Sequence, residues 1–305
     1  MKNIKSITIT YLSKVTFASL NGADKEVDNI NPIKKITMAN GSELPYVSSQ
    51  ALRRALRDSL VEMGWAESTV QEASAKKGAP KTQLKPAEYI EDDLFGYMDA
   101  SPSKEEKGKG TSVVRTSPIR VEALVALTDY KGDMDYATNF MVKGVKNEKG
   151  EEQQPNIFET EIHSGIYRGT ILIELDRIGS GQGFENTSEL SPAEKCKRVL
   201  AFMDAFRNLW SSGRQTRFLA DISPKFVAAA AMTTKNPVFL EAVQVDKNGQ
   251  VNAEALQSVV TDYDRFISGH IFATQEAVFG KPGASVSLKD GFETIESWVK
   301  QHFGQ

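Results

Sequence analysis

An amphipathic helix with a serine cap is predicted by the stretch Tyr46-Val-Ser-Ser-Gln-Ala-Leu-Arg-Arg-Ala-Leu-Arg-Asp58. At about 100° per residue, its polar side chains fall in one stripe and its apolar side chains on the opposite side. The polar stripe consists of Gln50, Arg53, Arg54 and Arg57, and the apolar side of Leu52, Ala55, Leu56 and Met63. We therefore expect one face of the helix to pack against a core and the other to be offered to an anion.

The start of this helix favours phosphate as the anion. Ser48 or Ser49 supplies the N-cap oxygen, so the free backbone N–H groups of the first turn lie close to Gln50. A solvated arginine face is the alternative, because surface helices commonly carry charged side chains. The rest of the chain has to decide between the two.

The composition is that of an ordinary globular protein. Of the 305 residues, 40% are hydrophobic and 25% charged, and no apolar run reaches the ~18 residues that span a bilayer. We expect neither a membrane span nor a secretory signal. The net charge of −3 lacks the basicity of many nucleic-acid binders. Any nucleic acid must therefore be held by local basic clusters.

Outward from the helix, strands and helices follow in the order β-α-β-β-α-β. Strands are predicted over 4–20, 119–127, 165–175 and within 217–232, and helices over 49–63, 191–210, 252–268 and 290–303. The order is typical of the ferredoxin-like α+β fold shared by RNA-recognition domains. The predicted organisation is a first part of the core (1–64), a finger-like insertion (65–118), a core strand (119–129), a projecting hairpin (130–163) and the rest of the core with the C-terminal helices (164–305).

The common enzyme motifs are missing from the sequence. Gly179-Ser-Gly-Gln-Gly183 has Phe184 where a dinucleotide fingerprint requires its third glycine, which indicates a flexible turn. His163, His270 and His302 have no second His or Cys at metal-ligand spacing. We therefore expect no catalytic site, no metal and no cofactor.

One enzymatic alternative stays open in the loop after the first strand. Asp24, Glu26 and Asp28 could hold a divalent metal or position a hydroxyl for cleavage of an RNA strand. An Asx-rich surface turn is the plainer interpretation, because carboxylates are common in turns.

Together these features resemble the CRISPR-associated Cascade backbone subunits, the Cas-seven family of the RAMP superfamily, and most of all its DevR-like branch of type I systems. The resemblance is carried by Ala18-Ser-Leu-Asn-Gly22, by the helix motif from Ser48 to Arg57 and by Glu161-Ile-His-Ser-Gly-Ile-Tyr-Arg-Gly169. It extends from the first strand to about Phe226 and is loose from Asn236 onward. The helix motif is its most specific part.

The resemblance implies a non-catalytic subunit that polymerises along a CRISPR RNA in the cytoplasm of a prokaryotic cell, with no cofactor and no membrane. Its partners would be the CRISPR RNA, further copies of itself, other Cascade subunits and, through guide pairing, target DNA, in antiviral defence or guide-directed transposition. Recognition is delegated to base pairing in such complexes, so the protein needs phosphate contacts rather than base contacts.

A set of RNA-binding residues is predicted from three sources: the resemblance, the helix face that Arg54 shares with Arg53 and Arg57, and the residues at 164–168, where close backbone approach and a guanidinium would suit a phosphate. The set consists of Asn21, Ser48, Ser49, Gln50, Arg53, Arg54, Arg57, Ser164, Gly165, Arg168, Arg214, Gln215 and Arg217. The hairpin matches a family thumb that reaches over the RNA of the neighbouring subunit, with Phe140, Met141 and Val142 as an apolar wedge beside the bases.

Alternatives to this set of roles also stay open. The wedge residues could form a plain hairpin core, and the loops at 164–168 and 213–217 could be plain turns. Ribonuclease relatives carry a catalytic aspartate in the loop that holds Asp24 and Asp28, so cleavage of target RNA is the alternative activity. A further alternative is an unrelated ferredoxin-like protein whose arginine face contacts a partner protein.

Overall fold

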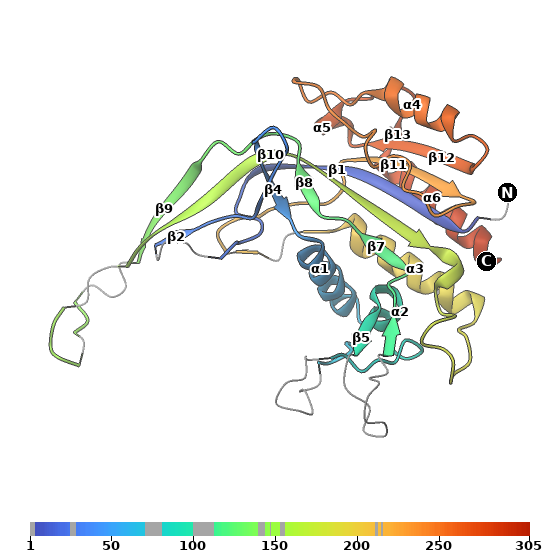
Figure 1. Cartoon of the computed structure of the whole chain (residues 1–305), viewed down its shortest axis with the longest axis horizontal. Coiled ribbons are helices and arrows are strands. Elements are labelled where there is room, and N and C mark those ends of the chain that lie inside the picture. Colours follow the sequence, from blue (N-terminus) through green and yellow to red (C-terminus); the bar gives the residue numbers. More distant parts are fainter. Residues whose placement is uncertain are drawn as a thin grey trace.

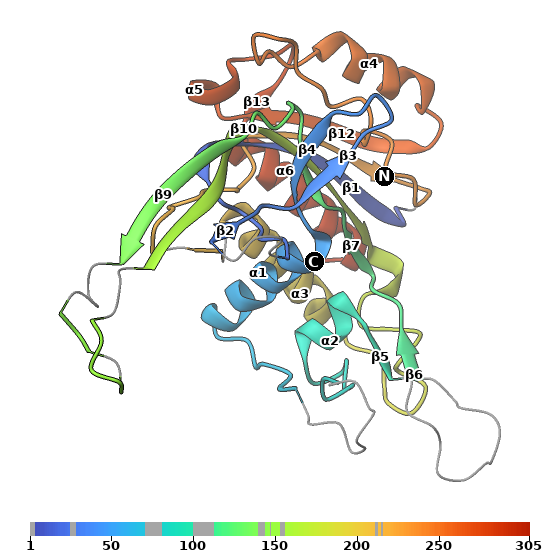
Figure 2. The same ribbon diagram turned by 60° about the vertical axis from the view of Figure 1, so that its left-hand side comes forward.

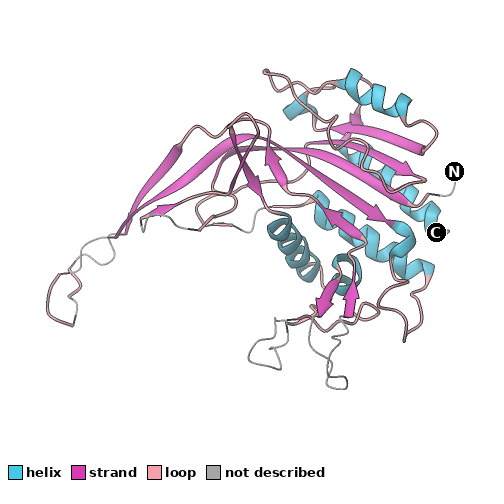
Figure 3. Ribbon diagram, in the orientation of Figure 1, coloured by secondary structure: helices cyan, strands magenta, loops and turns pink. Residues whose placement is uncertain are grey.

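The computed structural model describes residues 4–24, 29–70, 81–99, 113–139, 144–146, 148–152, 156–210, 213–214 and 216–305. They form one large, mostly antiparallel sheet with helices on both faces (Figures 1 and 3). The chain is therefore of the α+β class, as predicted. Among these residues, no helix is both long and apolar enough to cross a membrane.

The centre of the sheet is β1 (Ser6–Ala18), which lies between β10 (Asn156–Glu174) and β11 (Phe226–Met232). Both neighbours run antiparallel to β1, and Ile9 is paired with Ile171 of β10. The predicted alternation of β1 is confirmed over its first part, because Ile7, Ile9, Tyr11 and Val15 are buried in one core cluster. Phe17 leaves this pattern and is 50% exposed, since the register shifts between Val15 and Ala18.

Shorter strands extend the sheet on both sides. They are β12 (Ile267–Thr274) and β13 (Val286–Ser287) beyond β11, and β7 (Ile119–Val121), β8 (Leu124–Ala126), β4 (Glu43–Val47) and β3 (Lys35–Thr37) beyond β10. The strand predicted over 119–127 is thus divided in two at Glu122 and Ala123.

The helix predicted over 252–268 is too long. It ends at Asp262 as α4 (Ala253–Asp262), and the chain turns at Tyr263 into β12, which pairs antiparallel with β11. The prediction failed here because β12 begins only a few residues after α4 ends and few turn-forming residues lie between them. The helical pattern was therefore extended through the turn.

The main hydrophobic core lies on one face of the sheet, beneath α1 (Ser49–Glu62), α3 (Pro192–Arg207) and α6 (Leu288–Phe303). A smaller core on the opposite face lies beneath α4 and near α5 (Glu276–Phe279). Figure 1 shows α1 and α4 on opposite sides of the sheet. Residues on the α1 side and residues on the α4 side of the sheet therefore belong to different surfaces of the molecule.

The predicted sides of α1 are largely confirmed. Leu52, Ala55 and Leu56 are buried in the main core, which fixes the rotation of the helix about its axis. Met63 was predicted wrongly, because it is the C-cap residue rather than part of the helix, and it is 43% exposed.

A hairpin projects from the sheet within residues 130–163, the range over which a hairpin was predicted (Figures 1 and 2). It consists of β9 (Asp133–Asn139) and the first half of β10, and β2 (Ile30–Asn31) pairs with the other edge of β10. Because β10 runs from the hairpin into the centre of the sheet as one strand, the hairpin is rooted in the core.

Within the predicted insertion, α2 (Ile90–Phe95), β5 (Tyr97–Asp99) and β6 (Val113–Arg115) lie close to the lower ends of α1 and α3 in both ribbon views. Phe95 and Leu94 belong to the main core, whereas Met98 is 70% exposed. The insertion is thus joined to the body through α2.

Three consecutive carboxylates of α2, Glu91, Asp92 and Asp93, are all buried. Asp93 pairs with the fully buried Arg115 and accepts a hydrogen bond from Arg198 Nη1 at 2.9 Å. Glu91 and Asp93 are paired with arginines, whereas Asp92 accepts hydrogen bonds from the Ser68 hydroxyl and the Lys85 amide. These partners offset the unfavourable burial of the charges.

The turn predicted at Gly179–Gly183 is anchored to the same carboxylate. The Gly179 amide donates to both carboxylate oxygens of Asp93, at 3.0 and 3.1 Å. Gly179 has a φ of +61°, and a Cβ there would lie 2.9 Å from Leu190. This turn therefore serves the internal packing of the chain.

Candidate nucleic-acid interface

The start of α1 is fixed by three of the predicted RNA-binding residues. Ser48 is the N-cap and its Oγ accepts from the Ala51 amide at 3.3 Å. Asn21 Oδ1 accepts from the Ser48 amide at 2.9 Å, and Ser49 Oγ donates to the Val121 carbonyl at 2.6 Å. Asn21 and Ser49 thus hold the helix in place from inside, and RNA contact by either stays a prediction.

Gln50 and Arg54 form the open part of the predicted stripe. Gln50 is exposed, and the side chain of Arg54 is 66% exposed with its Nε 2.8 Å from Asp58. An ion pair so exposed is weak, because solvent screens it. Arg54 can therefore leave the Asp58 carboxylate for a phosphate at little cost in free energy.

Arg53 and Arg57 lie on the same side of α1 but are half-buried against α2. Their guanidinium carbons lie 5.7 and 4.7 Å from the centre of the Phe95 ring, which is the geometry of a cation–π contact. Arg53 Nη2 donates to the Phe95 carbonyl, and Arg57 Nε lies 3.5 Å from Glu91. The sequence prediction missed both partners, Phe95 and Glu91.

The surroundings of these arginines shift their pKa values. Burial lowers the pKa of Arg53 and of Arg57, and the charge of Arg53 lowers the pKa of Arg57 further, while Glu91 opposes the shift. Both guanidinium groups nevertheless remain protonated, because the ordinary pKa of an arginine lies far above neutral pH. Burial also raises the pKa of Glu91.

The basic loop at 213–217 contacts the root of the hairpin. Arg214 Nη1 and Arg217 Nη1 donate to the Thr160 hydroxyl at 3.0 and 3.3 Å, and Arg217 also pairs with Asp135 of β9. Gln215 lies outside the described residues. This loop therefore braces the hairpin, and its contact with RNA stays a prediction.

Arg168, after the hairpin, lies on the opposite face of the sheet from α1. Arg168 shares its face of β10 with Ile166, which packs on the smaller core, and its Nη2 lies 3.5 Å from Glu241. Ser164 is exposed, and a Cβ at Gly165 would lie 2.8 Å from the His163 ring. The predicted set of RNA ligands is thus divided between two faces.

The predicted wedge, Phe140, Met141 and Val142, lies outside the described residues. Closer to the sheet, the hairpin exposes Met134, Tyr136 and Ile157, at 41%, 59% and 44%. The spacing of Met134 and Tyr136 puts them on one face of β9. The alternation of Met134 and Tyr136 with polar residues was the sequence signal that could have predicted these exposed side chains.

The acidic loop has one described member. Asp24 is exposed, whereas Glu26 and Asp28 lie outside the described residues. Within the described ranges, no three His, Cys, Asp or Glu side chains come together in a way that could hold a metal ion.

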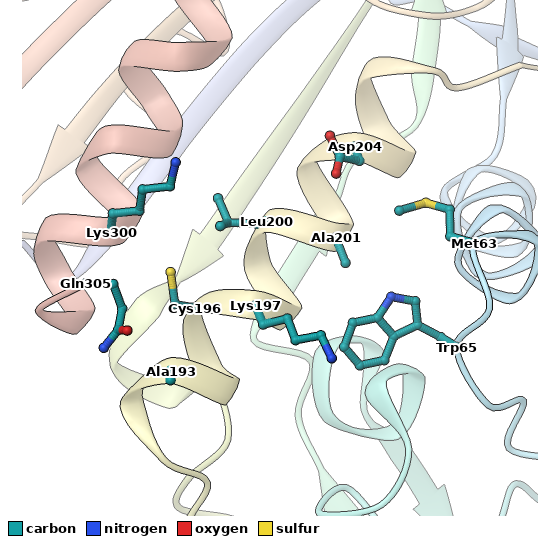
Figure 4. A pocket seen from close by; sticks show the side chains of 10 residues that line it. All are labelled: Met63, Trp65, Ala193, Cys196, Lys197, Leu200, Ala201, Asp204, Lys300 and Gln305. Atoms are coloured by element: carbon teal, nitrogen blue, oxygen red, sulfur yellow. The ribbon is translucent and has the colours of Figure 1, made fainter.

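One hollow of the described surface is mostly apolar. It measures about 570 Å³ and opens between α3, the end of α6 and the residues after α1 (Figure 4). Trp65 and Leu200 line it, with Lys300 and Lys197 beside them, and the Lys197 ammonium lies 4.9 Å from the Trp65 ring. It contains none of the predicted RNA ligands.

Comparisons with known proteins agree on one family. The family model described as CRISPR-associated negative auto-regulator DevR/Csa2 matches residues 9–254. A curated relative from Myxococcus xanthus (strain DK1622), the CRISPR-associated protein Cas7/Cst2/DevR, is 33% identical over 148 residues, which cover 46% of this chain and 48% of the relative. The match thus spans about half the length of that relative.

Solved structures are similar in fold. A chain of a "CRISPR RNA-guided surveillance complex, pre-nicking" has a TM-score of 0.59 at 14% identity and covers 96% of this chain and 100% of its own length. A chain of another "CRISPR RNA-guided surveillance complex" has a TM-score of 0.58 at 16% identity, with 96% and 99% covered. With the family match extending from β1 to the start of α4, the chain belongs to the DevR/Csa2 family of CRISPR-associated proteins.

Proposed function

We propose that the chain is an RNA-binding backbone subunit of a type I CRISPR surveillance complex, in which several copies line up along one guide RNA. The family membership supports the CRISPR role. The fold similarity to chains of RNA-guided surveillance complexes supports the place of the chain in such an assembly. The guide, further copies, other subunits and base-paired target DNA are the proposed partners, in the prokaryotic cytoplasm.

The arginine side of α1 is the observation that carries this proposal. The first turn of the helix contains no acidic residue, so the partial positive charge of its N-terminus is not neutralised locally. Gln50 and Arg54 are exposed on this side. Arg53 and Arg57, about one helical turn apart, lie on the same side. Such a surface attracts the phosphates of an RNA whatever its base sequence, as a subunit that holds many different guides requires.

We further propose a palm, finger and thumb arrangement. The strand order β11-β1-β10-β8, with α1 and α3 on one face, supports a ferredoxin-like palm. The segment that contains α2 would be the finger and the β9–β10 hairpin the thumb. An exposed apolar side chain such as Tyr136 would suit contact with bases, because stacking tolerates any sequence.

We propose a non-catalytic role. The alternative, an RNA-guided ribonuclease, depends on Asp24 or Asp28, and Asp24 stands exposed in its loop. Magnesium-dependent cleavage of an RNA complementary to the guide, lost in Asp24→Ala or Asp28→Ala, would establish that alternative and overturn the non-catalytic proposal.

The RNA that copurifies with the chain tests the proposal. The chain is expressed together with a CRISPR array and its neighbouring subunits, purified, and the bound RNA is sequenced. We expect RNA of one length class that carries repeat-derived ends. A complex that assembles without RNA would contradict the proposal and favour an arginine face that contacts a partner protein.

A further inference from the structure

We infer that Phe95 is a positioning residue for RNA binding: its ring and carbonyl hold Arg53 and Arg57 in the orientation in which they meet the phosphate chain. The inference rests on the proposed function and adds a component to it, because Phe95 lies in the insertion and about forty residues from the arginines in sequence. Phe95 touches no RNA in this account.

The contacts of Arg53 are the first step. Its Nη2 donates to the Phe95 carbonyl, and its guanidinium carbon lies 5.7 Å from the centre of the Phe95 ring. Its Nε is buried and has no hydrogen-bond partner among the described residues. Phe95 thus fixes the plane of the guanidinium while leaving donors unused.

The contacts of Arg57 complete the pair. Its guanidinium carbon lies 4.7 Å from the same ring, and its Nε lies 3.5 Å from Glu91. Two arginines one helical turn apart would otherwise repel each other and sample many rotamers. A shared aromatic face and one carboxylate offset the repulsion, and the side chain of Arg57 remains 26% exposed.

The ring itself is fixed in place. Phe95 is 1% exposed and lies edge-on to Phe202 of α3, with ring centres 6.2 Å apart. Between Glu91 and Phe95, two carboxylates of α2 are anchored: Asp92 accepts from the Ser68 hydroxyl at 2.9 Å, and Asp93 lies in the buried arginine network. A rigid platform lowers the entropy that the arginines lose when they bind.

The test compares Phe95→Leu with Phe292→Leu. Both variants remove a buried ring from the main core, but Phe292 lies on α6 and packs on Phe206, with ring centres 6.1 Å apart. For Phe95→Leu we expect an RNA affinity loss of about tenfold, the size of a partly desolvated cation–π contact. We also expect a flatter dependence of affinity on salt. Phe292→Leu should keep the affinity of the folded protein and lose only thermal stability.

A double-mutant cycle separates positioning from folding. In an Arg53→Ala/Arg57→Ala background, Phe95→Leu should cause no further loss of RNA affinity, because nothing is left to position. If Phe95→Leu does not fold, a ring-fluorinated phenylalanine at position 95 keeps the shape and weakens the negative face of the ring, and it should lower affinity in the same direction.

The outcomes are distinguishable. Unchanged or tighter RNA binding by folded Phe95→Leu or by the fluorinated protein would overturn the inference, since Phe95 would then be a neutral or a sequestering contact. If Arg53→Ala/Arg57→Ala itself binds RNA normally, the proposed RNA-binding face fails instead.

Discussion

Two pairs of arginines meet the short helix α2 and differ in how many of their donors are used. Arg115 and Arg198 lie inside and share Asp93, whereas Arg53 and Arg57 lie outside and share Phe95. All five N–H donors of Arg115 have acceptors, four of them on Asp93 O, Ser180 O, Gln182 O and Arg177 O and one on the Asp93 carboxylate. Arg198 makes four hydrogen bonds, to Glu194, Pro86, Asp93 and Ala87, so the inner pair is close to saturation.

The outer pair is not saturated. Among the described residues, Arg53 has one hydrogen bond and a buried Nε without an acceptor, and Arg57 has one carboxylate at 3.5 Å. A guanidinium offers five donors in a fixed fork that matches phosphate. The comparison teaches that donor occupancy, rather than exposure alone, separates a structural arginine from one available to a ligand.

The inner pair should give the largest effect on folding. Arg115→Met leaves the Asp93 charge without one partner in the interior, which should lower the free energy of unfolding by about 3–5 kcal/mol. Urea unfolding of Arg115→Met measures this loss, with the exposed Lys289→Met of α6 as control, expected within about 0.5 kcal/mol of wild type. A loss as small as that of the control would remove the distinction between the two pairs.

The arginines at the hairpin root are an intermediate case. Arg217→Ala removes the half-exposed ion pair with Asp135 and the hydrogen bond to Thr160. We expect a loss of about 1 kcal/mol in unfolding free energy. Limited proteolysis of Arg217→Ala should show faster cleavage in the hairpin than in the sheet. Hairpin cleavage at the wild-type rate would mean that the loop does not brace the hairpin.

Arg54 should give the smallest effect on stability. Arg54→Ala loses one exposed ion pair with Asp58, worth about 0.3–0.5 kcal/mol in a helix. Removal of one phosphate contact should nevertheless flatten the slope of log affinity against log salt by about 0.7 for single-stranded RNA. A salt titration of Arg54→Ala and of Lys289→Ala measures the difference, and equal slopes would exclude Arg54 as a phosphate ligand.

The sequence predicts those parts of the molecule whose cause is local. The Ser48 cap, the burial of Leu52 and Leu56 and the alternation of β1 all follow from residues within one segment. The partners of the arginines do not, because Phe95 and Glu91 reach α1 only through the packing of α2 on the core. The same reason separates Arg168 from α1, since the face of the sheet on which a side chain lies depends on register and on what covers each side.

Binding of fluorescently labelled single-stranded RNA by Arg53→Ala/Arg57→Ala, across a series of salt concentrations, tests the central claim most directly. Lys247→Ala/Lys289→Ala is the control, because it removes the same charge from exposed positions outside the arginine face. We expect the arginine variant to bind RNA of every sequence more weakly and to have a slope flatter by about 1.4, for two phosphate contacts at about 0.7 each. Affinity and slope equal to those of the lysine control would contradict the account.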